Sequence, residues 1–172
     1  MLRRDQASGG RWRRATVRAA EFFHARAQRF ALELVDCVQA LVPFAPDSNL
    51  VCLALNPRGN ASVAVANAFA RKLHDTLRSD PHQPLQTKEF FGSVTTLRPD
   101  MLGPEQTTRI FGALGLDTGN LDPEEDRLMS LRHTLMNPFL IDHENGINYI
   151  DRYFEFLGRR VHALLDTTGA TP

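Results

Sequence analysis

The sequence has few cysteines and no long apolar run. Its two cysteines, Cys37 and Cys52, are too few for the disulfide framework of a small secreted protein, so we expect two reduced, buried thiols. No apolar run reaches the roughly 18 residues that a membrane-spanning helix needs. Acidic residues interrupt the longest candidate, residues 31–44, and no apolar segment follows the arginines at the N-terminus as in a secretory signal. These absences predict a cytoplasmic protein.

Length and charge limit the function classes further. The chain has 172 residues, of which 42% are hydrophobic and 23% charged, values typical of one globular domain. The net charge is zero, but residues 1–30 carry eight arginines and two acidic residues. This basic segment lacks any nucleic-acid-binding motif or basic–aromatic repeat, so neither nucleic acid nor a membrane is an expected partner. We interpret residues 1–14 as a disordered basic arm, because Gly9 and Gly10 disfavour a helix.

Apolar spacing predicts helices and strands in alternation. Apolar residues recur every three to five positions in the segments predicted as helices, which are residues 14–42, 62–77, 104–114 and 146–166. Short apolar or β-branched runs predict strands at residues 49–55, 89–97 and 128–136. Asn60 or Ser62 is placed to cap the second helix. This order predicts an α+β fold, a small sheet with helices on one face.

The last predicted strand contains the most informative charged residue. Strand alternation places Leu131, His133 and Leu135 on one face and Arg132 on the other. A permanent charge within an interior strand needs an anion as partner. Three explanations of Arg132 stay open: an edge strand, an ion pair within the domain, or an anionic ligand. We interpret His133 as a hydrogen-bonded core residue.

Two further polar segments do not form an active site by themselves. The turn Asn56–Asn60 precedes a helix but has only one glycine, whereas phosphate-binding loops need several, so a capped turn is predicted. Asp142, His143 and Glu144 are adjacent, and adjacent side chains do not converge on one metal ion. We interpret this segment as a solvated loop and predict no metal site.

Three segments, in the same order, resemble the small C-terminal domain of group II pyridoxal-phosphate (PLP) dependent amino-acid decarboxylases. They are FAPDSNLVCLALNPRGN at 44–60, EFFGSVTTL at 89–97 and LRHTLMNP at 131–138. The first two are similar to the first two strands of that domain. The third is similar to the arginine-containing strand of glutamate and aromatic-amino-acid decarboxylases. The bacterial tyrosine-decarboxylase-like branch is nearest, and the resemblance covers about residues 15–165.

The resemblance implies a domain organisation and partners. The fold would be the small domain of the aspartate-aminotransferase-like fold, with about three antiparallel strands and helices on the outer face. Residues 15–42 would form a long connecting helix, residues 43–166 the small domain and residues 167–172 a tail. The partners would be a large PLP-binding domain or a second subunit of a homodimer, and an amino-acid substrate in the complete enzyme.

The resemblance also implies roles for single residues. Arg132 matches the family arginine that reaches a carboxylate of the bound substrate–cofactor adduct, since a guanidinium can bond both carboxylate oxygens. Ser93 and Thr95 lie on the strand that approaches the substrate side chain. These three residues are the predicted substrate-binding residues.

The lysine that would hold PLP has no match in this chain. The family lysine follows a histidine, whereas Lys72 follows an arginine and Lys88 follows a threonine. We therefore expect a truncated carboxy-lyase domain that has no catalytic residue and binds no PLP alone. The alternative is a stand-alone, non-catalytic α+β binding or interaction module.

Overall fold

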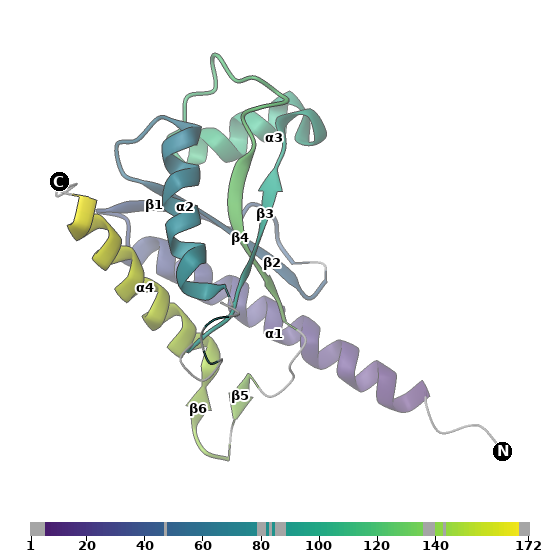
Figure 1. The fold of residues 1–172 in the computed structure, drawn as a ribbon. Coiled ribbons are helices and arrows are strands. Elements are labelled where there is room, and N and C mark those ends of the chain that lie inside the picture. The colour runs from purple at the N-terminus through teal and green to yellow at the C-terminus, as the bar shows by residue number, and fades with distance from the viewer. Residues whose placement is uncertain are drawn as a thin grey trace.

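A computed structural model describes residues 6–46, 48–78, 82, 84, 89–135, 140–142 and 144–168, with only the backbone for 6–16 and 168. Four helices and six strands follow one another in this part of the chain (Figure 1). In chain order they are α1 (Gln6–Glu33), β1 (Val38–Leu41), β2 (Leu50–Pro57), α2 (Val63–Leu77), β3 (Ser93–Leu97), α3 (Pro99–Ala113), β4 (Leu128–Thr134), β5 (Ile141–Asp142), β6 (Ile147–Asn148) and α4 (Tyr149–Thr168). The predicted α+β class is confirmed.

The main sheet is antiparallel throughout and has the strand order β1-β2-β4-β3. The three predicted strands correspond to β2, β3 and β4, so β2 and β4 are interior strands. Arg132 lies opposite Cys52 on one side and Ser93 on the other. The predicted end of the third strand, Met136, lies outside the described residues. The short β5–β6 hairpin lies at the opposite end of the sheet from α3 (Figure 1).

The first helix differs from the prediction at both ends. It begins at Gln6 and includes Gly9 and Gly10, so the expected break at these glycines is wrong. It ends at Glu33, and Val38–Leu41 forms the strand β1 instead of a further helical turn. The backbone of β1 pairs with β2 in the register Val38↔Pro57, a partner too distant in sequence for helical spacing to reveal. The sheet therefore has four strands, one more than predicted.

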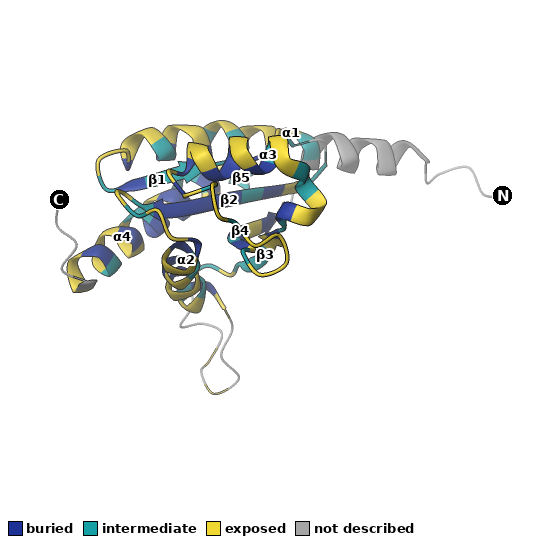
Figure 2. Cartoon of the chain, turned by 90° about the horizontal axis from the view of Figure 1, so that it is seen from above, coloured by how far each residue is buried: buried dark blue, intermediate teal, exposed yellow. Residues whose placement is uncertain are grey.

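Two apolar clusters fill the two sides of the sheet. The larger one contains Val51, Leu53 and Leu55 of β2 and the inner faces of α1, α2 and α4. The smaller one joins Ala54 of β2 to α3. Three of the four helices thus cover one face, and α3 covers one end of the other. Figure 2 shows buried residues along β2, whereas the outer helix surfaces are exposed.

Contacts between α1 and α4 close the larger cluster. The rings of Phe30 and Phe154 pack with their centroids 5.1 Å apart. Arg26 lies beside them, and its side chain is only 11% exposed. Its guanidinium donates to Asp151 at 3.1 Å and pairs with Glu33 at 3.2 Å. The cation is stable there because two carboxylates replace its lost hydration.

The predicted N-cap of α2 is confirmed, whereas the predicted start of α3 is partly correct. Ser62 caps α2, since its hydroxyl accepts the backbone N–H of Val65. In α3, Gly103 has a φ of 77° and interrupts the helix, and Pro104 follows it. The predicted start at Pro104 is therefore the second part of a helix that begins at Pro99. No helix in the described part of the chain is both long enough and apolar enough to span a membrane.

Phe30→Ala tests the α1–α4 contact. Phe30 is 2% exposed, so we expect the free energy of unfolding to fall by about 3–5 kcal/mol through lost burial and a cavity. Phe22→Ala on the same helix is the matched control, because Phe22 is 39% exposed, and should cost less than about 1 kcal/mol. Urea unfolding followed by circular dichroism measures both. Equal losses would contradict this packing of α1.

Candidate functional site

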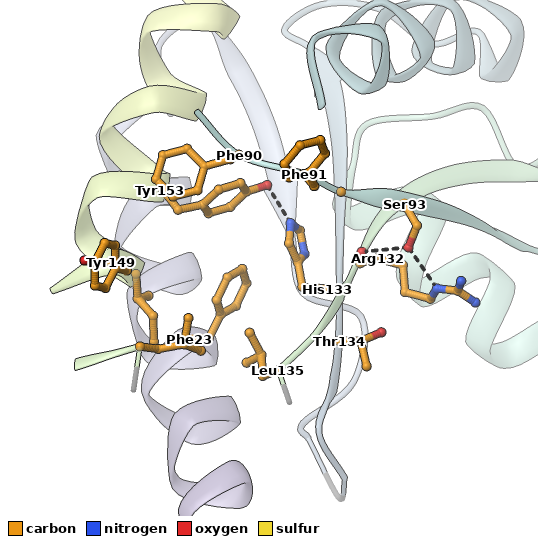
Figure 3. A pocket seen from close by; sticks show the side chains of 13 residues that line it. Phe23, Phe90, Phe91, Ser93, Arg132, His133, Thr134, Leu135, Tyr149 and Tyr153 are labelled. Carbon is orange, nitrogen blue, oxygen red and sulfur yellow. Dashed lines mark hydrogen bonds between the residues drawn. The ribbon is translucent and has the colours of Figure 1, made fainter. Parts of the chain in front are cut away.

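Arg132 lies on the sheet face that α3 leaves partly open. Its strand is interior and its side chain is exposed, so the edge-strand explanation is wrong. Its Nε donates to the Ser93 hydroxyl at 3.2 Å, and that hydroxyl donates to the Arg132 carbonyl oxygen at 3.1 Å (Figure 3). No carboxylate among the described residues pairs with Arg132, and Asp47 and Asp80 lie outside those residues. The guanidinium can therefore receive an anionic ligand without losing an ion pair to any described residue.

The strand register defines what surrounds Arg132. We call the surface formed by Cys52, Ser93, Thr95 and Arg132 the Arg132 face, because strand alternation directs these side chains to the same side. Thr95 lies opposite Ser130, and it is not among the described residues that line the cavity next to Arg132. Of the three predicted substrate-binding residues, the structure brings Arg132 and Ser93 into contact, and Thr95 lies two residues further along β3.

Both cysteines are free and half-buried, less enclosed than expected. Burial raises the pKa of the Cys52 thiol, although the Arg132 cation nearby acts in the opposite direction. Burial, and then the charge of Asp36, raise the pKa of Cys37. Both side chains are therefore neutral thiols at neutral pH.

His133 lies on the other face of β4. It is buried and hydrogen-bonded, which confirms the prediction that it is a core residue. Its Nε2 lies 2.5 Å from the hydroxyl oxygen of Tyr153, and its ring packs on Phe23 with centroids 4.6 Å apart. Burial lowers the pKa of His133 to about 4 and raises the pKa of Tyr153. The pair is therefore uncharged at neutral pH.

A cavity of about 360 Å³ lies beside this pair. Aromatic and aliphatic side chains of α1, α4, β4 and the segments before β3 and β5 line most of it, including Phe23, Phe90, Phe91, Leu135, Leu140 and Ile150. Sequence reasoning missed this cavity, because its walls come from five separate segments. Only the inward direction of His133 pointed to it.

The two polar segments predicted from the sequence to form no active site, residues 56–60 and 142–144, have internal hydrogen bonds typical of turns. Asn56 donates to the carbonyl oxygens of Asn60 and Leu114, so the Asn56–Asn60 turn is bonded internally. The Asp142 carboxylate accepts the backbone N–H groups of Glu144 and Asn145, while His143 lies outside the described residues. Within the described ranges, no three His, Cys, Asp or Glu side chains are grouped to hold a metal ion.

One comparison with known proteins identifies the family. The family model described as "Tyrosine decarboxylase, C-terminal" matches residues 18–160. The chain belongs to this tyrosine decarboxylase C-terminal family. The match confirms the resemblance seen in the three strand segments, and it covers the whole four-stranded sheet. No curated protein matches the chain.

The described residues of this tyrosine decarboxylase C-terminal domain do not fit a PLP site. PLP enzymes hold the cofactor through a lysine. Lys72 is exposed on α2, whose inner side packs on the sheet face opposite Arg132. Lys88 lies outside the described residues. No lysine of the described part therefore lies on the Arg132 face.

The buried His133 of the decarboxylase C-terminal domain predicts a pH effect. In the folded chain its pKa falls from the ordinary 6.5 to about 4, so the unfolded chain binds the proton more readily between these values. The free energy of unfolding should therefore fall as the pH drops from about 6.5 to about 4, by up to about 3 kcal/mol from this group. Urea unfolding at a series of pH values measures the slope.

His133→Gln should flatten that slope, because glutamine does not titrate in this range. His162→Gln is the matched control, since His162 is exposed at the surface of α4. We expect the control to keep the slope of the original chain. If both variants keep the pH slope of the original chain, His133 is not the cause of that slope.

Proposed function

We propose that this chain is the C-terminal domain of a PLP-dependent amino-acid decarboxylase, in which Arg132 binds a carboxylate of the amino-acid substrate. The observation that carries the proposal is the exposed Arg132 on an interior strand, oriented by Ser93 and without a carboxylate partner among the described residues. The family match to a decarboxylase C-terminal domain supports the reaction class.

The geometry of Arg132 suits a carboxylate. The Nε of Arg132 donates to the Ser93 hydroxyl, and no described residue forms a hydrogen bond with Nη1 or Nη2 of Arg132. These two nitrogens can donate in parallel to both oxygens of a carboxylate, the strongest arrangement of a charged hydrogen bond. Because the Ser93 hydroxyl also donates to the Arg132 backbone, it holds the guanidinium against its own strand. Thr95, on the same side of β3 as Ser93, would contact the substrate side chain.

The bond-breaking chemistry would belong to another part of the enzyme. PLP supplies the electron sink for loss of carbon dioxide, and its lysine would come from a large cofactor-binding domain or from a second subunit of a homodimer. Exposed apolar side chains support such a covering partner. Phe44 and Leu50, near the Arg132 face, are 47% and 46% exposed, and Leu32 on α1 is 73% exposed. The two free cysteines are consistent with a reducing cytoplasm.

The second candidate is a stand-alone binding module that uses the same fold without chemistry. The absence of a lysine from the described part of the Arg132 face favours it over an isolated enzyme. The two candidates differ in one result: only the decarboxylase domain should contribute to turnover when combined with a PLP-binding domain.

Arg132→Gln tests the proposed role in an active enzyme assembled from this chain and a PLP-binding decarboxylase domain. Loss of a bidentate charged bond should lower kcat/KM by roughly 100-fold. Ser93→Ala should lower it by several-fold, because the guanidinium loses its orientation. Arg71→Gln, which removes an equal charge from the exposed side of α2, is the control and should change little. Equal effects of Arg132→Gln and Arg71→Gln would reject the role.

The chain alone should show no decarboxylase activity. Incubated with PLP and borohydride, it should form no adduct at one defined lysine, as judged by peptide mass spectrometry. It should also release no carbon dioxide from tyrosine or glutamate, because the described Arg132 face has no lysine. A known PLP-dependent decarboxylase treated in parallel is the positive control. Clear turnover by the chain would show that the chemistry lies within it.

A further inference from the structure

The cavity beside His133 is lined mostly by aromatic and aliphatic side chains, and it reaches Ser93 and Arg132 at its edge. Its volume of about 360 Å³ is sufficient for a single-ring compound, since an apolar cavity of about 150 Å³ already binds benzene. Five phenyl or phenol side chains from three segments line it: Phe23 of α1, Phe90 and Phe91 before β3, and Tyr149 and Tyr153 of α4. Such a lining favours a flat, apolar ligand.

The Tyr153 hydroxyl in the cavity wall can form one more hydrogen bond. Its hydroxyl hydrogen-bonds to His133, and no other described residue bonds to it. If Tyr153 donates to Nε2, its oxygen can still accept a bond. If Nε2–H donates to Tyr153, the phenol hydrogen is still free to donate. A ligand hydroxyl can both donate and accept, so it complements Tyr153 in either state.

The charge of the walls excludes ions. None of the described residues that line the cavity carries a carboxylate, so these residues offer an organic cation no counter-ion. Arg132 is at the edge, but Figure 3 shows its guanidinium pointing away from His133 and Tyr153. His133 and Tyr153 are buried and uncharged at neutral pH, so an anion would also lack a partner. A zwitterionic amino acid therefore does not suit this cavity.

We propose that this cavity binds a small, neutral, single-ring aromatic compound whose hydroxyl group hydrogen-bonds to Tyr153. The ring would lie among the aromatic side chains that line the cavity, and the hydroxyl would point toward the His133–Tyr153 pair. The hydroxyl partner in this site is Tyr153, whereas the carboxylate partner proposed above is the Arg132 guanidinium, which points away from the His133–Tyr153 pair (Figure 3).

A pair of probes of nearly equal shape, p-cresol and toluene, tests the proposal on the purified chain by ligand-observed NMR titration. If Tyr153 bonds the hydroxyl, p-cresol should bind with one-to-one stoichiometry and roughly five- to tenfold more tightly than toluene. If the cavity is only apolar, p-cresol should bind more weakly than toluene, because its hydroxyl would be buried without a partner. The order of the two affinities therefore decides the question.

Tyr153→Phe provides the sharper test, because it keeps the ring and removes only the hydroxyl. We expect toluene binding to stay within about twofold and the preference for p-cresol to disappear. Retention of the preference would overturn the role of Tyr153. Arg71→Gln, on the exposed side of α2 and away from the cavity, is the control and should leave both affinities unchanged.

A cavity-filling variant keeps the test valid if Tyr153→Phe does not fold. Leu140→Trp adds bulk to a half-buried lining residue and should abolish binding of both probes, whereas Leu32→Trp on exposed α1 should bind both normally. Circular dichroism confirms that each variant is folded. Absence of binding by either probe to the original chain, up to its solubility limit, would overturn the proposed site.

Discussion

The antiparallel pairing of β2 with β4 is the constraint on which the rest of the structure depends. Its register places Val51 opposite His133 and Cys52 opposite Arg132. Because strand side chains alternate strictly, a shift by one residue would bury the Arg132 guanidinium in the apolar cluster and expose His133 to water. The large penalty for an unpaired buried charge holds the register in place.

This register gives the two faces of one strand opposite physical properties. Toward α1 and α4, burial keeps His133 and Tyr153 neutral and surrounds them with aromatic rings. Toward the open side, Arg132 keeps its charge, and Ser93 limits the directions it can adopt. The neutral His133–Tyr153 pair and the cationic Arg132 guanidinium therefore point to opposite sides of the same strand.

The α1–α4 contact makes the buried side possible. Phe23 reaches His133 only because Phe30 and Arg26 hold the same helix against Phe154 and Asp151 further along. In sequence, these two helices are separated by the entire sheet. A domain whose first and last helices enclose its core depends on both ends of the chain for stability.

Periodicity alone was sufficient for the three predicted strands, the Ser62 cap and the opposite directions of Arg132 and His133, because these features depend on neighbouring residues. The same periodicity failed at Val38–Leu41, whose apolar spacing fits a helix until β2 supplies backbone partners. It also failed at the cavity, whose rings are brought together only by packing of α1 on α4. Motifs and residue spacing were therefore enough to predict the family, the α+β class and the residue types on each strand face. Tertiary structure decided that β4 is interior, that Arg132 has no carboxylate partner in the described part of the chain, and that Tyr153 meets His133, because these depend on contacts between residues far apart in the chain.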